Sequence, residues 1–96
     1  MAVRLLVRWV ARAGEEAAVA AIIEEVATLS QAEPGCRHYI VSRDRDDHQV
    51  FVLFEEYVDE AALEEHAASE HFRELVLGRA VPLLDERVRT FLTPFA

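Results

Sequence analysis

The sequence lacks lysine and contains a single cysteine, Cys36. One thiol cannot form an intrachain disulfide, which suits a reducing cytoplasm, the compartment that we expect for this protein. All ten basic residues are arginines scattered along the chain, and 18 acidic residues bring the net charge to -8. Because nucleic acids are bound by clustered basic side chains, this charge distribution disfavours nucleic acid as a partner.

The sequence also lacks a long uncharged apolar run. The longest one, residues 17–23, is far too short to span a bilayer, so no membrane partner is expected. The first residues lead straight into an alternating segment without a cleavage-site pattern, so we expect no targeting segment. A glycine-rich phosphate loop and a cysteine pair with zinc-ligand spacing are missing as well.

The chain of 96 residues is 52% hydrophobic and 29% charged, which is typical of one globular domain spanning residues 1–96. Alternation and turn signals predict strands over residues 2–11, 36–43, 49–57 and 86–93. Helices are predicted over residues 15–31 and after Asp59, a good N-cap. The order β-α-β-β-α-β predicts an α+β fold, a ferredoxin-like two-layer sandwich with an antiparallel sheet.

Apolar residues recur at helical spacing in both helical segments. In the second helix Leu63, His66 and Ala67 share one face, and Gly78 and Pro82 are expected to end helical structure. In the first helix the predicted inner residues are Ala18, Ile22, Val26 and Leu29.

The third strand predicts a homodimer. Residues 50–54 are all apolar, so both faces of the sheet should be covered. Two helices can cover only one face, and we expect the other to meet the sheet of a second copy.

Candidate catalytic groups gather around the third strand and the second helix. Either Glu55 or Glu56 should point inward, where an imidazole of His66 or His71 is a natural partner. A buried Glu-His pair can act as a general base or proton relay, although a structural hydrogen bond or ion pair is an alternative interpretation. His71 follows His66 by five residues, so both can face one pocket only if the helix breaks near Ser69.

Other residues could complete a pocket. His38 could join from the second strand, and Trp9, Tyr57 and Phe72 are aromatic residues of the core that suit an aromatic ligand where they line a cavity. Two histidines and a carboxylate could also form a facial iron site. Because the helix histidines are not spaced i, i+4, we expect no metal.

These residues together resemble a known family. The pattern comprises Glu33-Pro34-Gly35-Cys36, the strand end Glu55-Glu56-Tyr57, then Asp59-Glu60-Ala61-Ala62, His66 and His71-Phe72. It closely resembles the antibiotic biosynthesis monooxygenase domain family over essentially the whole chain, with the quinol monooxygenase and autoinducer-2-degrading branches nearest. The resemblance implies a dimer whose two sheets meet as an α+β barrel.

The resemblance also implies an activity. Characterised members oxidise phenolic or quinol-type aromatics with O2, without metal, flavin or haem, so the expected cofactor is none. By motif position, His66 or His71 would be the base, oriented by Glu55. The expected pocket residues are Tyr57, Trp9 and Phe72, with His38 as a hydrogen-bond partner of a substrate oxygen.

Two alternatives stay open. The chain could be an isomerase-like enzyme that acts on a small phosphorylated metabolite, as in the autoinducer-2-degrading branch. The phosphate would then need inward arginines, for which the candidates are Arg4, Arg8, Arg37 and Arg87. The other alternative is a non-catalytic dimeric module that binds a small molecule in the same pocket.

Overall fold

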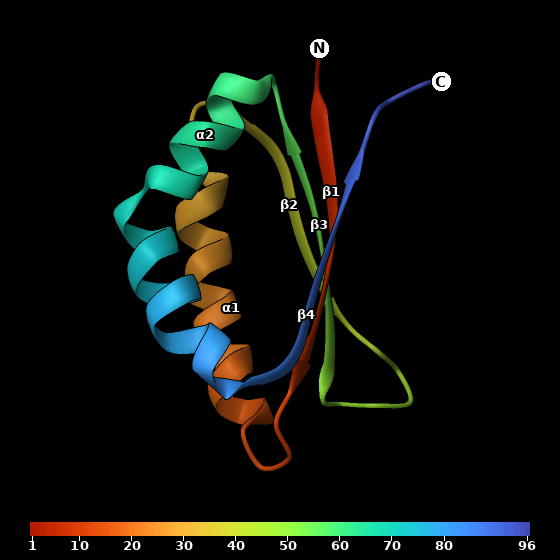
Figure 1. Ribbon diagram of the computed structural model, residues 1–96, viewed down its shortest axis with the longest axis vertical. Helices are drawn as coiled ribbons and strands as arrows, with labels where there is room; N and C mark the ends of the chain where they lie inside the picture. Colours follow the sequence, from red (N-terminus) through yellow and green to blue (C-terminus); the bar gives the residue numbers. More distant parts are fainter.

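The computed structural model describes residues 1–96 and consists of a four-stranded antiparallel sheet and a layer of helices (Figure 1). The strands are β1 (Val3–Ala11), β2 (Cys36–Arg43), β3 (Val50–Tyr57) and β4 (Leu84–Leu92), in the order β2-β3-β1-β4. The helices are α1 (Glu16–Gln31), α2 (Glu60–Ala68), the π-helix η1 (Phe72–Ala80) and the short 3-10 helix η2 (Val81–Leu83). The predicted ferredoxin-like order is therefore confirmed.

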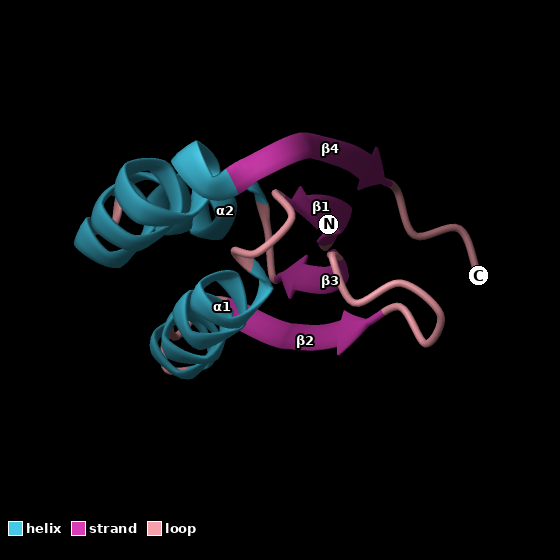
Figure 2. Cartoon of the chain, turned by 90° about the horizontal axis from the view of Figure 1, so that it is seen from below, coloured by secondary structure: helices cyan, strands magenta, loops and turns pink.

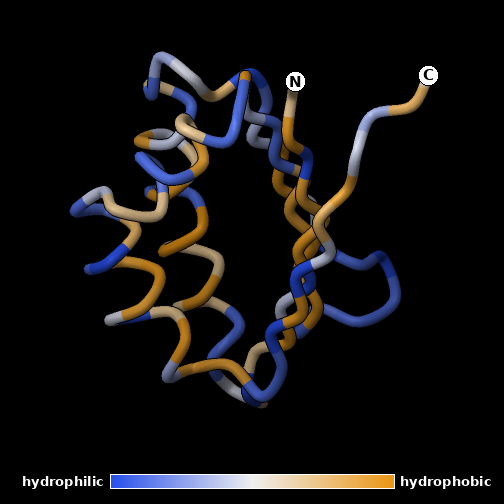
Figure 3. The backbone as a smooth tube through the Cα atoms, turned by 45° about the horizontal axis from the view of Figure 1, so that its top comes forward, coloured by the Kyte–Doolittle hydropathy of each residue, from blue (hydrophilic) through white to orange (hydrophobic).

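The core lies between the sheet and the helices. All helices cover the same face of the sheet, with α1 nearer β2 and the second helical segment nearer β4 (Figure 2). Hydrophobic segments run along the strands and the helices that face them (Figure 3). The alternating residues of β1 supply the centre of this core: Val3, Leu5, Val7, Trp9 and Ala11.

The buried face of α1 differs from its predicted face. Ile22 and Val26 are buried as expected, but Ala18 is exposed and Leu29 is 41% exposed. Val19 and Ile23 take their place in the core. The larger branched side chains at these two positions bury more apolar area than Ala18 would, so the helix turns them inward.

The second helical segment continues beyond its predicted end. Gly78 lies inside η1 and does not end this helix. Buried residues on either side of Gly78 hold η1 against the core. Pro82 lies in the first turn of η2, where its missing N–H costs no hydrogen bond. β4 begins at Leu84, two residues earlier than predicted, because a bulge lets Leu84 pair with Ala11.

The opposite face of the sheet is not covered by any helix (Figures 1 and 2). Ile40, Phe54 and Leu6 lie side by side across β2, β3 and β1 on this face. Ile40 is 53% exposed and Leu6 is 43% exposed. We call this row the outer apolar face.

None of the helices combines the length and the apolar character that crossing a membrane would require.

Candidate active site

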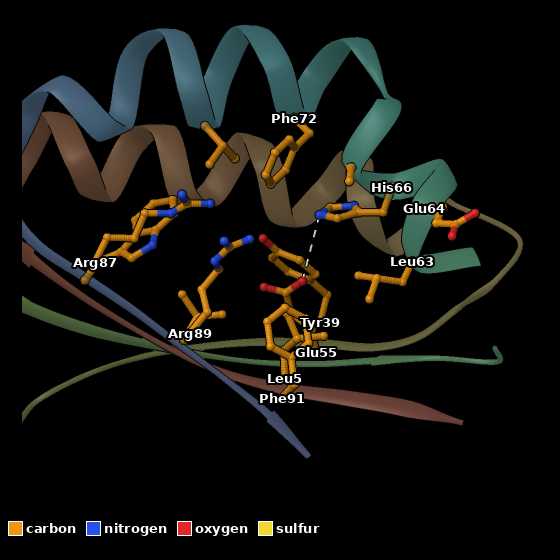
Figure 4. A pocket seen from close by; sticks show the side chains of 14 residues that line it. Leu5, Tyr39, Glu55, Leu63, Glu64, His66, Phe72, Arg87, Arg89 and Phe91 are labelled. Atoms are coloured by element: carbon orange, nitrogen blue, oxygen red, sulfur yellow. Dashed lines mark ion pairs between the residues drawn. The ribbon is translucent and has the colours of Figure 1, made fainter. Parts of the chain in front are cut away.

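A cavity of about 180 Å³ lies between the sheet and the second helical segment. Figure 4 shows Phe72 on the helix side, with Leu5 and Phe91 on the sheet side. Apolar side chains form most of its wall, mainly Leu5, Val7, Trp9, Leu63, Phe72, Val76 and Phe91. The polar groups of the wall come from Tyr39, Glu55, Glu64, His66, Arg87 and Arg89. A largely apolar pocket with a few polar groups is the usual form of a small-molecule site.

Glu55 is the inward carboxylate of β3. Strand alternation turns it toward the helices, between Leu5 of β1 and Tyr39 of β2, and leaves it 6% exposed. The Tyr57 hydroxyl donates a 2.7 Å hydrogen bond to Glu55 Oε1. Burial raises the pKa of Glu55, and this effect outweighs the opposing hydrogen bond from Tyr57 and the nearby His66 ring.

The raised pKa of Glu55 makes stability depend on pH. Because the folded protein holds this proton more tightly than the unfolded chain does, stability should fall as pH rises from about 4.5 through the raised pKa. Each pH unit between the two pKa values corresponds to about 1.4 kcal/mol. Glu55→Gln keeps an acceptor for Tyr57, so its free energy of unfolding should rise relative to wild type over this range. Urea unfolding at several pH values measures the difference, and a difference that does not change with pH would contradict the expectation.

His66 lies in the last turn of α2 and is 3% exposed. Its ring packs between Tyr57 and Phe72, with ring centroids 5.1 and 5.2 Å away. Its Nδ1 lies 2.8 Å from Glu33 Oε2, and its Nε2 lies 3.8 Å from Glu55 Oε1 (Figure 4). An ionised carboxylate can only accept, so Nδ1 carries the proton and a neutral ring leaves Nε2 with a free lone pair on the cavity side.

Ser69 breaks the helix between the two histidines, which is the condition that their spacing set for both to face one pocket. Its backbone is extended, its hydroxyl donates to the His66 carbonyl at 2.7 Å, and the same hydroxyl accepts from Phe72 N at 3.2 Å. The break brings His71 Nε2 to 2.7 Å from the Glu33 oxygen that His66 also contacts. His71 does not line the cavity, so the two imidazoles meet at Glu33 and not in the pocket.

Glu33 is the site residue that sequence reasoning missed. It lies in the short loop between α1 and β2, where neither helical nor strand periodicity fixes the direction of a side chain. The segment from Glu33 to Cys36 held the one signal that could have located Glu33, because its Gly35 lies very close to α2. A Cβ on Gly35 would collide with the Ala62 Cβ of α2. This close approach holds the loop against the helix that carries His66.

The same three residues have the donor set of a metal site. One ligand atom from each of Glu33, His66 and His71 lies within 4.8 Å of the other two. Two imidazoles and a carboxylate suit a divalent transition metal. In the structure, both nitrogens lie at hydrogen-bond distance from Glu33 Oε2, and these two hydrogen bonds join the three side chains into one network.

The other predicted pocket residues are placed differently. Trp9 and Phe72 line the cavity, whereas Tyr57 is fully buried behind Glu55. His38 lies on the outer face of the sheet, 57% exposed, with Nε2 3.7 Å from Glu56 Oε1. The strand register shifts between Cys36 and His38, so that His38 pairs with Glu56 and Tyr39 takes the inward position. This bulge places His38 outside the cavity.

The four arginines that were candidates for binding a phosphate lie in different parts of the structure. Arg4 and Arg8 lie on the outer face, where they pair with Glu56 at 2.7 Å and Glu86 at 2.9 Å. Arg37 is exposed at the bulge of β2. Only Arg87 lines the cavity, together with Arg89, which the sequence did not single out.

Comparisons with known proteins agree with this fold. Residues 2–76 match the family described as antibiotic biosynthesis monooxygenase. A Mycobacterium tuberculosis protein named "Putative monooxygenase Rv0793" is 34% identical over 70 residues, which cover 73% of this chain and 68% of that protein. Its solved structure superposes with a TM-score of 0.93, at 30% identity over 100% of this chain and 97% of that one.

Two further solved structures are similar. PA3566 from Pseudomonas aeruginosa is 31% identical, with a TM-score of 0.90 over 99% of this chain and 95% of that one. SnoaB, described as a cofactor-independent oxygenase from Streptomyces nogalater, is 18% identical, with a TM-score of 0.84 over 97% and 92% of the two chains. At that identity the similarity to SnoaB concerns the fold alone.

Proposed function

Because the chain belongs to the antibiotic biosynthesis monooxygenase family, we propose that it is a monooxygenase that oxidises a small phenolic or quinol-type aromatic with O2. The observation that carries this proposal is the His66 ring. Its Nδ1 is held by Glu33 and its Nε2 borders an apolar cavity beside Glu55. A fixed imidazole with one free nitrogen in a largely apolar pocket is suited to remove a proton from a bound hydroxyl.

Glu33 supports the base in two ways. Its carboxylate accepts the Nδ1 proton at 2.8 Å, so it fixes the tautomer, and its negative charge stabilises the imidazolium that forms when Nε2 takes a proton. His71 donates to the same oxygen at 2.7 Å and so fixes the position of that carboxylate. In this proposal His66 is the base, and Glu33 and His71 are positioning residues.

The reaction needs no external reductant. His66 takes the hydroxyl proton of a phenol, and the phenolate passes one electron to O2. The resulting radical pair combines at the ring carbon para to the oxygen, which forms a C–O bond. The peroxide takes up a proton and its O–O bond breaks, while the hydrogen on that carbon leaves as a proton. One phenol and one O2 give one quinone and one water, and the substrate supplies all four electrons.

Oxygen uptake by metal-stripped protein tests this function. A panel of single-ring phenols with a hydrogen on the carbon para to the hydroxyl should include at least one substrate that consumes one O2 per quinone formed and releases no hydrogen peroxide. We expect removal of metal to leave the rate unchanged, because no step depends on a metal. No uptake with any member of the panel, or activity that returns only when a metal is added, would contradict the proposal.

We infer that the outer apolar face joins two copies of the chain. The row of Ile40, Phe54 and Leu6 leaves large apolar side chains exposed on a sheet face that no helix covers. A contiguous apolar face of this kind is typical of an interface. A second sheet packed on it would give the barrel that the sequence resemblance implies.

Leu6→Arg should weaken this dimer. The substitution places an unpaired charge in the apolar interface, which costs about 3–5 kcal/mol or about 100-fold or more in the dissociation constant. The matched control is Leu29→Arg on α1, since Leu29 is 41% exposed and Leu6 is 43% exposed. Sedimentation velocity should show a dimer for wild type and the control, and monomer for Leu6→Arg. The same sedimentation for both variants would contradict the interface.

A further inference from the structure

We propose that the substrate carries an anionic group, a carboxylate or a phosphate, which binds Arg87 and Arg89 while its aromatic hydroxyl faces His66. This inference rests on the proposed function and adds the substrate class. Figure 4 shows the two arginines reaching into the cavity from β4, and His66 entering it from α2 on the other side. Phe72 lies between them on the helix side.

Arg87 stands apart among the arginines of the chain. Only Arg4 and Arg87 are half-buried, and the other eight are exposed. Arg4 has a carboxylate partner in Glu56, at 2.7 Å, whereas Arg87 takes part in no ion pair and its buried Nε has no hydrogen-bond partner. A partly desolvated guanidinium without a partner is costly, so an anion that fills the cavity would compensate it.

The neighbours of Arg87 add further donors. The carboxylate of Glu55 lines the same cavity and its charge acts on Arg87, but Glu55 accepts from the Tyr57 hydroxyl and forms no ion pair with Arg87. Arg89, two residues further along β4, also lines the cavity without an ion pair. Trp9 pairs with Arg87 across the strands, lines the same cavity, is 2% exposed and has an Nε1 without a hydrogen-bond partner. In a chain with a net charge of -8, two unpaired cations beside an unpartnered indole N–H select for an anion.

The cavity limits the size of the ligand. Its volume is about 180 Å³. An apolar cavity of about 150 Å³ in another protein holds one benzene molecule, so this space suits a single ring with small substituents. Phe72 and Phe91 supply aromatic walls for such a ring. We therefore expect an aryl acid with a free hydroxyl and not an extended polycyclic molecule.

Binding to the full-length protein under anaerobic conditions tests the inference apart from turnover. The probes are 3-hydroxybenzoate, its neutral amide 3-hydroxybenzamide, and 3-hydroxyphenyl phosphate, titrated by calorimetry. At least one anion should bind about tenfold or more tightly than the amide. Whichever anion binds more tightly identifies the group as carboxylate or phosphate.

Arginine variants locate the effect. Arg87→Gln and Arg89→Gln should each reduce the preference for the anion by about tenfold and leave binding of the amide within about twofold. Arg45→Gln, an exposed residue in the β2–β3 loop, makes the same change in net charge and should leave the preference unchanged. Because Arg89 is exposed, its variant should fold even if Arg87→Gln does not.

Equal binding of the amide and both anions would overturn the anionic substrate, as would a preference that survives both arginine substitutions. A neutral phenol that is oxidised at the same rate as its acid would also overturn it, and would leave the proposed monooxygenase intact. Conversely, tight anion binding with no oxygen uptake from any phenol would remove the proposed activity and support the anion site.

Discussion

His66→Ala should lower the rate of phenol oxidation by about 100- to 10,000-fold, the usual contribution of a positioned general base. The loss follows from the geometry of one ring: Nδ1 is tied to Glu33 at 2.8 Å, and Nε2 is the only imidazole nitrogen that borders the cavity. Steady-state oxygen uptake at saturating substrate measures it. His48→Ala, which removes an exposed histidine from the β2–β3 loop, is the matched control and should keep the wild-type rate.

His71→Ala distinguishes the base from its support. His71 touches Glu33 but not the cavity, so its removal should cost no more than about tenfold in rate. Circular dichroism and thermal melting should show that both variants remain folded. If His66→Ala stays within about fivefold of wild type, or His71→Ala loses more activity than His66→Ala, His66 is not the base.

Gly35→Ala should destabilise the fold by about 1–3 kcal/mol, because the new Cβ collides with the Ala62 Cβ across the contact between the α1–β2 loop and α2. The loop that ends at Gly35 carries Glu33, and the helix that contains Ala62 carries His66. Forcing them apart should therefore also lengthen the contact between Glu33 and His66 and lower the oxidation rate. Urea unfolding and oxygen uptake measure the two effects.

The double variant Gly35→Ala, Ala62→Gly provides the control for Gly35→Ala. Ala62→Gly alone should cost about 1 kcal/mol, the usual helix penalty of glycine. The Cα of Ala62 lies 3.5 Å from the new Cβ, an ordinary contact, so the double variant should be more stable than the sum of the single effects requires. If the changes in the free energy of unfolding were strictly additive, Gly35 and Ala62 would not be in contact.

The fold could be predicted because its signals are local and agree with one another. The apolar run of β3 marked a strand, and Asp59 marked the start of α2, where its side chain accepts from Ala62 N at 2.9 Å. The inward position of His66 followed from the helix period. Strand alternation required only that either Glu55 or Glu56 point inward, and the family resemblance singled out Glu55. The spacing of the two histidines named a break near Ser69 as the condition for both to face one pocket; the break is present, but only His66 lines the cavity.

The positions of the remaining site residues depend on features that helical and strand periodicity do not encode. A single bulged residue in β2 reverses the alternation, so Tyr39 faces the cavity in place of His38. Glu33 reaches the histidines from a loop whose path is set by the contact between Gly35 and Ala62. Arg89 lies on an exposed edge strand, where an inward cation has no signature in the sequence.

The most direct test is a crystal structure of the protein with a bound phenolic substrate, obtained without oxygen so that the reaction cannot proceed. The substrate oxygen should lie about 2.6–3.2 Å from His66 Nε2, with its ring against Phe72. A ligand bound on the outer apolar face, or one in the cavity with its hydroxyl turned away from His66, would contradict the role of this histidine as the base.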